Sequence, residues 1–255
     1  MADFEIADTD LTNVDTVGLC GASPLGHARK REWLRQCLPE GLRYRIAVEA
    51  ATGRAVGMIE YAPGEVAWRA VDAPGYMVIH CLQVPKASAG RGVGSLLVQE
   101  CVEDARRNGM AGVVALATAK GWCADNRIYL KNGFQVVDRA APSLELVATQ
   151  LRPVEPASFG DWEERLRRLG PGVYMYVSKQ CPFLSADRPL ARREWIRREY
   201  GLSAQVIDVA SHEMAQANPC VWGSSGVICN GQIVNYVSGG DAPLRDRLRR
   251  MRPAR

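Results

Sequence analysis

The 255-residue sequence has no apolar run that approaches the ~20 residues needed to span a membrane, so we expect no membrane-embedded segment. Its first residues, Met-Ala-Asp-Phe-Glu, do not have the pattern of a signal peptide. There is no zinc-type CxxC pair, and the sequence has only three histidines. The eight cysteines are scattered, as expected for reduced thiols in a cytosolic chain. We therefore expect a cytoplasmic protein without a metal site.

Positive charge is concentrated in the second part of the chain. The net charge is only +4, but arginines cluster at residues 192–198 and 245–255. Both clusters lie on helix-like patterns, which is typical of solvated helix faces rather than of a nucleic-acid site. We expect neither a nucleic acid nor a membrane as a partner.

A glycine-rich turn is the most informative motif. An apolar, β-rich run over residues 76–84 precedes Gly90-Arg91-Gly92-Val93-Gly94-Ser95, and apolar residues then recur at helical spacing. Glycines allow close approach of the backbone, and free N–H groups at a helix N-terminus attract phosphate. The spacing is neither that of a Walker loop nor that of a GxGxxG fingerprint. Alternatively, the glycines serve turn geometry alone.

Three motifs in order resemble the signature of the GNAT superfamily of N-acetyltransferases. They are Leu82-Gln83-Val84-Pro85, Ala89-Gly90-Arg91-Gly92-Val93-Gly94 and Tyr129-Leu130-Lys131-Asn132-Gly133-Phe134. The resemblance covers residues 1–150. Two positions depart from the family pattern, since Ala89 replaces an Arg or Gln and Trp122 stands near the place of a CoA-contacting Asn. A pyrophosphate contact is then either missing or supplied by Lys86 or Arg91.

The order of expected elements fits the α/β layout of this acyl-CoA N-acyltransferase fold. We expect a strand at 4–6, helices near 13–19 and 28–38, and a hairpin of strands 44–49 and 55–61. The strand that ends at Val84 follows, then helix 95–108, strand 112–117, helix 124–132 and the last strands of the domain.

The resemblance implies acetyl-CoA as co-substrate and assigns residues to it. A splayed strand would offer backbone groups to the pantetheine and the thioester, and the glycine turn would hold the pyrophosphate. The cofactor-binding residues implied in this way are Leu82, Gln83, Val84, Gly90, Arg91, Gly92, Val93, Gly94, Ser95 and Asn126.

Acetyl transfer needs a base for the attacking amine and an acid for the leaving thiolate. Tyr129 matches the general acid of the family, although it could instead only pack on Phe134. His80 is one candidate base, because the unperturbed pKa of a histidine side chain is about 6.5. Glu60 is the other candidate. A water relay, a core role for His80 and an ion pair between Glu60 and Arg69 are the alternatives. Regular strand alternation would place His80 and Cys81 on opposite faces.

Residues 151–160 read as a linker, after which the pattern restarts. We expect a helix at 162–169, a strand at 172–178, a turn at Cys181-Pro182-Phe183-Leu184, a helix at 186–200 and a strand at 205–209. A hairpin around Asn230-Gly231 and a helix at 243–251 would end the chain. Residues 161–255 resemble a thioredoxin or glutaredoxin fold, and most closely the YoaP-like domains fused behind acetyltransferase domains.

Cys181 is the candidate reactive group of this C-terminal domain, since it lies where redox cysteines open a helix. Leu184 replaces the resolving cysteine, and Ser224-Ser225-Gly226 stands where a cis-proline segment is usual, unless Asn218-Pro219 supplies it. A dithiol oxidoreductase is therefore disfavoured. One-thiol chemistry, a resolving role for Cys220 or Cys229, and simple packing remain open.

Two functions follow from these motifs. The first is an acetyl-CoA-dependent N-acetyltransferase that acts on a small-molecule amine, with the C-terminal domain shaping the acceptor cleft. The second is a thiol-centred enzyme or sensor, in which Cys181 acts on a thiol, electrophile or soft metal and the first domain is a CoA-binding scaffold. Gly92-x-Gly94 and Tyr129 favour the first, and Ala89 mildly favours the second. A non-enzymatic adaptor and a homodimer are also left open.

Overall fold

The computed structural model describes residues 4–19, 24–118, 125–141, 143–183, 187–235 and 241–251. Their contacts divide the chain into two compact units. The first unit contains residues 4–19, which begin with β1 (Phe4–Asp8), and the stretches Arg31–Ala67 and Val71–Phe159. The second contains the chain from Gly160 onward together with residues 24–30 and Trp68–Ala70. No helix in the described ranges is long and apolar enough to cross a membrane.

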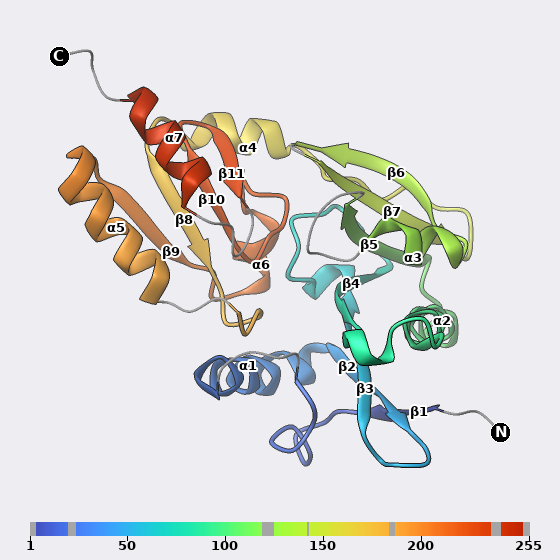
Figure 1. The fold of residues 1–255 in the computed structure, drawn as a ribbon. Helices are drawn as coiled ribbons and strands as arrows, with labels where there is room; N and C mark the ends of the chain where they lie inside the picture. Colours follow the sequence, from blue (N-terminus) through green and yellow to red (C-terminus); the bar gives the residue numbers. More distant parts are fainter. Residues whose placement is uncertain are drawn as a thin grey trace. The chain divides into compact units, whose positions relative to one another are not determined.

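The first unit is built on a seven-stranded mixed sheet (Figure 1). The strands follow the order β1-β2-β3-β4-β5-β7-β6, and only the central pair β4–β5 is parallel. Their bounds are β2 (Arg43–Glu49), β3 (Ala55–Pro63), β4 (Tyr76–Gln83), β5 (Gly112–Thr118), β6 (Gln135–Ala140) and β7 (Leu144–Gln150). These bounds confirm the expected strands to within a few residues.

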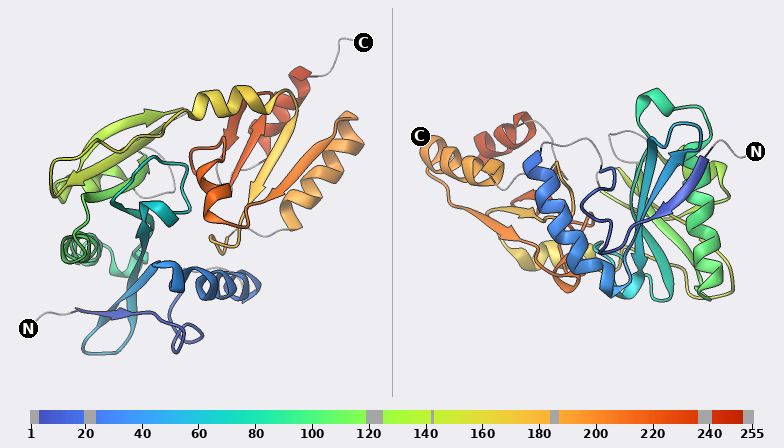
Figure 2. Two further views of the ribbon diagram at one scale, coloured as in Figure 1. Left: turned by 180° about the vertical axis from the view of Figure 1, so that it is seen from behind. Right: turned by 90° about the horizontal axis from the view of Figure 1, so that it is seen from below.

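Three α-helices accompany this sheet in sequence. They are α1 (Pro24–Cys37), α2 (Val93–Arg107) and α3 (Asn126–Lys131), with single 3₁₀ turns at Leu38–Glu40, Gly64–Val66 and Lys86–Ser88. Helix α2 packs along the sheet against β3, β4 and β5 (Figures 1 and 2). The central helix was therefore predicted correctly from its apolar spacing.

The helix expected near residues 13–19 is wrong, because residues 11–17 form consecutive turns. The Asp10 carboxylate accepts hydrogen bonds from the backbone N–H groups of Thr12 (2.7 Å) and Asn13 (3.2 Å). Asn13 returns the contact by accepting from the Asp10 N–H at 3.0 Å. Such local side-chain acceptors compete with helical hydrogen bonds and favour turns.

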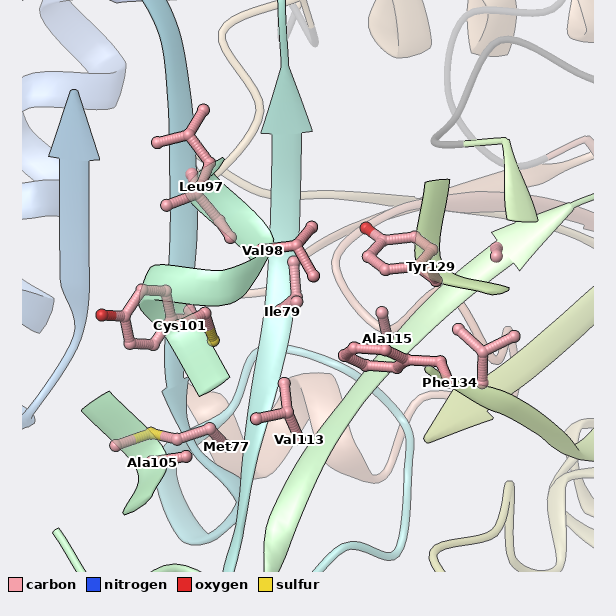
Figure 3. Close-up of a cluster of buried hydrophobic side chains, with 14 of the residues drawn as sticks. Met77, Ile79, Leu97, Val98, Cys101, Ala105, Val113, Ala115, Tyr129 and Phe134 are labelled. Carbon is pink, nitrogen blue, oxygen red and sulfur yellow. The ribbon is translucent and has the colours of Figure 1, made fainter. Parts of the chain in front are cut away.

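The core of the first unit lies between α2 and the central strands. Inward residues of β4 and β5 meet an apolar face of α2, and Tyr129 and Phe134 complete the cluster (Figure 3). The labelled members are Met77, Ile79, Leu97, Val98, Cys101, Ala105, Val113, Ala115, Tyr129 and Phe134. This packing anchors the helix whose first turn contains the glycine motif.

A charge network that is buried at Arg45, Asp104 and Tyr61 joins β1, β2, β3 and α2. The Arg45 guanidinium donates to Asp8 (2.5 Å), to Glu100 (2.6 Å) and to Asp104 (3.5 Å). The Tyr61 hydroxyl donates to the second Asp104 oxygen at 2.9 Å. Burial raises the pKa of Tyr61 well above its ordinary value, so the phenol stays protonated and serves as a donor.

The second unit is built on a four-stranded sheet in the order β11-β10-β8-β9. Strand β8 (Val173–Val177) is parallel to β9 (Ala204–Asp208) and antiparallel to β10 (Gly226–Cys229), which pairs with β11 (Gln232–Asn235). Helices α5 (Asp187–Tyr200) and α7 (Ala242–Met251) pack on the same core cluster, on one face of this sheet (Figure 1). The remaining helices are α4 (Trp162–Leu169) and α6 (His212–Gln216), of which the short α6 was not predicted.

The segment Trp68–Ala70 is an internal part of the second unit. One Arg69 nitrogen, Nη1, donates to the Gln180 side-chain oxygen (2.8 Å) and to the Ser224 hydroxyl (3.2 Å). The guanidinium lies 4.7 Å from the centre of the Trp222 ring. A Cβ added at Gly223 would lie 2.6 Å from the Arg69 Cα, so the two backbones approach at a distance that only glycine allows.

Candidate active site

The central parallel ladder ends in the middle of β4. Its last pair is Ile79 with Ala115, although β4 continues to Gln83 and β5 to Thr118. No further β4–β5 pair occurs among the described residues. Beyond Ile79, therefore, β4 no longer follows its parallel neighbour, as the resemblance implied for the strand that would hold the pantetheine.

A β-bulge occurs at the same point, on the other side of β4. Tyr61 is paired with Ile79 but Glu60 is paired with Cys81, which leaves His80 as the extra residue. Directly opposed residues share a face of the sheet, so Cys81 faces the same side as Glu60. His80 also contacts Glu60, so the expectation that His80 and Cys81 lie on opposite faces is wrong. The bulge breaks the alternation on which it rested.

The two candidate bases form one pair. His80 Nδ1 lies 3.3 Å from a Glu60 carboxylate oxygen, and neither side chain has exposed surface. The Trp33 ring packs on the imidazole at a centroid distance of 6.4 Å. The contact is an ion pair only when the imidazole is protonated. Whether either residue acts as the base stays a prediction.

The glycine turn has the backbone geometry of an anion site. Gly90 (φ +79°) and Gly92 (φ +87°) are left-handed, and Gly92 is the N-cap of α2. The first intrahelical bond runs from the Leu96 N–H to the Gly92 carbonyl. In the part of the chain that the structure describes, the N–H groups of residues 90–95 donate to no protein acceptor. These donors, together with the positive end of the α2 dipole, favour a phosphate.

The described chain leaves space in front of this turn. A Cβ at Gly90 or Gly92 would meet no atom of the described residues within 4 Å. At Gly94 a Cβ would instead lie 3.3 Å from Ile128 Cδ1, because α2 and α3 approach each other there. Gly90 and Gly92 are therefore needed for a left-handed turn, whereas Gly94 allows α2 and α3 to pack closely.

The basic side chains near the turn are placed differently from each other. Arg91 donates to Glu49 at 2.7 Å and lies 4.9 Å from the centre of the Phe4 ring, so β1 and β2 hold it. The Glu49 pKa is lowered by hydrogen bonds from Thr52 and from Arg91. Lys86 is exposed and makes no ion pair within the described chain. Of the two replacements suggested for the missing contact at Ala89, Lys86 is the one that is available.

The other predicted cofactor residues line the end of β4 and the start of α3. Leu82, Gln83 and Val84 are half-buried, and the two apolar ones pack on the edge of the core. The Asn126 side-chain amide donates to Glu145 on β7 at 2.7 Å. Trp122, the other departure from the family pattern, lies outside the described residues.

Tyr129 is almost fully buried on α3 and packs on Phe134, with ring centroids 5.5 Å apart. Figure 3 shows it at the edge of the core cluster, near Ala115, where the β4–β5 ladder ends. Tyr129 therefore packs on Phe134, as the alternative interpretation of this residue expected. This packing does not exclude a role for the hydroxyl, which stays a prediction.

The thiols of the second unit are mostly buried. Cys181 is half-buried in the turn after β8, whereas Cys220 and Cys229 are buried. The Cys220 thiol donates to the Ser225 carbonyl at 3.2 Å, and burial raises its pKa to about 12. Burial also raises the pKa of Cys229. Neither is a thiolate near neutral pH, which disfavours a resolving role in this conformation. Leu184 lies outside the described residues.

Asn132, which the sequence motifs did not single out, lies beside the glycine turn. It ends α3 directly after the Tyr129 turn, and its side chain bonds to Ser95 at the start of α2. The sequence signal was only an asparagine before Gly133, which is typical of the C-terminal end of a helix.

No group of three potential metal ligands occurs in the described ranges.

Comparison with known proteins agrees with this geometry. Residues 16–134 match the model of the Acetyltransferase (GNAT) family. The "Uncharacterized N-acetyltransferase YoaP" of Bacillus subtilis (strain 168) is 29% identical over 210 residues, which are 81% of this chain and 81% of that protein.

Solved structures with a similar arrangement match the chain in part. One is the GNAT family N-acetyltransferase YhbS from Escherichia coli in complex with CoA, with 16% identity, 59% of this chain and 82% of that chain covered, and a TM-score of 0.42. Another is spermidine N-acetyltransferase from Vibrio cholerae in complex with CoA and spermine, with 8% identity, 59% and 96% covered, and a TM-score of 0.44. Residues 16–134 are thus similar to the Acetyltransferase (GNAT) family, and this match together with the related sequence identifies the chain as an N-acetyltransferase with acetyl-CoA as its co-substrate.

Proposed function

We propose that this enzyme transfers the acetyl group of acetyl-CoA to the amine of a small molecule, at the point where β4 leaves β5. The observation that carries the proposal is the run of N–H groups at residues 90–95, which donate to no protein acceptor in the described chain. They follow β4, whose ladder with β5 ends at Ile79, after the single 3₁₀ turn Lys86–Ser88. The backbone between Ile79 and the first turn of α2 thus offers N–H donors for the pyrophosphate and a strand edge that is not paired with β5 for the pantetheine.

The chemistry assigned to the side chains is proton transfer. The amine nitrogen forms a bond to the thioester carbonyl carbon, and the carbon–sulfur bond then breaks. The Glu60–His80 pair accepts the proton that the amine loses, and the Tyr129 hydroxyl donates a proton to the departing thiolate. Each step is general acid–base catalysis, which typically contributes about 10²–10⁴-fold to the rate.

Burial of the base pair supports a small acceptor. The side chains of Glu60 and His80 have no exposed surface. An amine must come within hydrogen-bond reach of its base, or be linked to it by one water. A compact amine meets this requirement more readily than a residue within a folded protein.

For the second unit we propose a thioredoxin-like module spanning residues 161–255, after the linker at 151–160. The support is its topology, since a parallel β8–β9 pair and an antiparallel β10–β11 hairpin share one sheet, with α5 and α7 packed on one core. Nothing in the described chain favours the thiol-centred alternative for Cys181. A cytoplasmic location and a homodimer stay predictions.

The test is acetylation of a panel of small amines by the full chain, with release of free CoA as the readout. Tyr129→Phe should lower kcat with little change in acetyl-CoA affinity, because the hydroxyl acts mainly in the transition state. Tyr174→Phe is the matched control, since Tyr174 of the second unit is also buried and its hydroxyl donates to the Leu169 carbonyl at 2.8 Å. If both variants keep the wild-type kcat, the assignment of Tyr129 is refuted. If the wild type acetylates peptides and no small amine, the acceptor class is refuted.

A further inference from the structure

Asn132 connects the helix of Tyr129 to the first turn of α2. Its side-chain nitrogen donates to the Ile128 carbonyl (2.7 Å) and to the Ser95 hydroxyl oxygen (3.1 Å). Its side-chain oxygen accepts from Gln99 at 3.2 Å. Because a backbone carbonyl can only accept, the bond to Ile128 defines which end of the amide is nitrogen. Asn132 is therefore a donor toward Ser95.

This contact determines what the Ser95 hydroxyl can do. A hydroxyl has one hydrogen, and here its oxygen already accepts from Asn132. In the described chain the hydroxyl donates to no protein group. Its hydrogen is therefore available to an external acceptor, beside the N–H groups of the same helix turn.

The approach of the two helices keeps Asn132 in reach of Ser95. Gly94 has no side chain, and Ile128 of α3 fills the adjacent space, 3.3 Å from where a Cβ would lie. Asn132 lies one turn after Ile128 on α3 and faces Ser95, the residue after Gly94.

We propose that Asn132 is a positioning residue for acetyl-CoA, which orients the Ser95 hydroxyl so that it donates to a pyrophosphate oxygen. The inference rests on the proposed function, because it requires the pyrophosphate to bind at the turn of residues 90–95. Asn132 touches neither the thioester nor the amine. Its effect is confined to the phosphate end of the co-substrate.

The experiment is a double-mutant cycle with Ser95→Ala, Asn132→Ala and the double variant, measured by calorimetry with acetyl-CoA. Each single variant should weaken binding about tenfold, as expected for one lost hydrogen bond to a charged group. The double variant should bind no more weakly than Ser95→Ala alone, since Asn132 acts through that hydroxyl. Gln99→Ala, which keeps both bonds that Asn132 donates, is the matched control and should bind like the wild type.

A second readout separates positioning from a general structural effect. S-acetylpantetheine carries the thioester but no phosphate, so kcat/KM with this donor should be unchanged in Asn132→Ala. The inference would be overturned if Asn132→Ala lost kcat/KM equally with acetyl-CoA and S-acetylpantetheine, or if it bound acetyl-CoA like the wild type. Additive effects of Ser95→Ala and Asn132→Ala on acetyl-CoA binding would also overturn it. Asn132→Asp, which keeps the shape but accepts the Ser95 hydrogen, should also weaken acetyl-CoA binding and covers the case in which the alanine variant does not fold. If the wild type itself fails to bind acetyl-CoA, the proposed function fails instead.

Discussion

Gly92→Ala tests the phosphate turn most directly. Gly92 has φ +87°, and an added Cβ would meet no atom within 4 Å in the part of the chain that the structure describes. The cost to folding is therefore only that of a left-handed L-residue, about 1–2 kcal/mol. The same methyl group would stand in the open space at the N-terminus of α2, where we place the pyrophosphate.

Gly109→Ala is the matched control at the other end of the same helix. Gly109 has φ +65°, and its added Cβ would also meet no described atom within 4 Å. Both variants should therefore lose about 1–2 kcal/mol of unfolding free energy. In a chain of this size that lowers Tm by roughly 2–8 °C.

The two variants should differ only when acetyl-CoA is present. A ligand at 100 times its Kd stabilises the folded state by about 2.7 kcal/mol. In thermal unfolding with and without acetyl-CoA, Gly109→Ala should keep the wild-type increase in Tm, and Gly92→Ala should lose most of it. Equal increases in both variants would refute the placement of the pyrophosphate at this turn.

Two further predictions concern stability. Asp104→Asn should lower the unfolding free energy in urea by about 1.5–3 kcal/mol, because the Tyr61 hydroxyl (2.9 Å) and the more distant Arg45 guanidinium (3.5 Å) lose a buried charged acceptor. Asp8→Asn, at a side chain that is 70% exposed, should cost at most about 1 kcal/mol. Similar losses in the two variants would show that burial of the network does not determine its contribution. Burial raises the pKa of Tyr176 to about 12, and that of Cys220 also to about 12. Because burial raises the folded-state pKa values of both groups, each group contributes to the unfolding free energy below its ordinary pKa of about 9–10. This contribution is lost as the pH rises toward 12. Tyr176→Phe should therefore show a smaller decline in unfolding free energy between pH 8 and about 10.5 than the wild type, and an identical decline would contradict the assignment.

Elements with strong local signals could be predicted from the sequence. Helix α4 (Trp162–Leu169) has the expected bounds, and Asn230-Gly231 forms the expected turn, with positive φ at both residues. The glycine turn before α2 was also found, since only glycine adopts its left-handed positions without strain.

The side-chain arrangement of the site could not be predicted in the same way. The bulge at His80 depends on how β3 and β4 pair, and pairing register is a tertiary property that single-strand alternation does not contain. The same holds for Arg91, whose ion pair with Glu49 joins residues 42 positions apart. The bond between Asn132 and Ser95 likewise needs two helices to meet.

The place of Trp68–Ala70 has a consequence for dissecting this protein. These three residues belong to the second unit, although the chain before and after them belongs to the first. No single cut of the polypeptide therefore separates the two units intact. A fragment that starts at the linker would lack Arg69 and its bonds to Gln180 and Ser224. A polypeptide that contains only residues 160–255 would therefore need other residues in place of Trp68–Ala70 to make these hydrogen bonds.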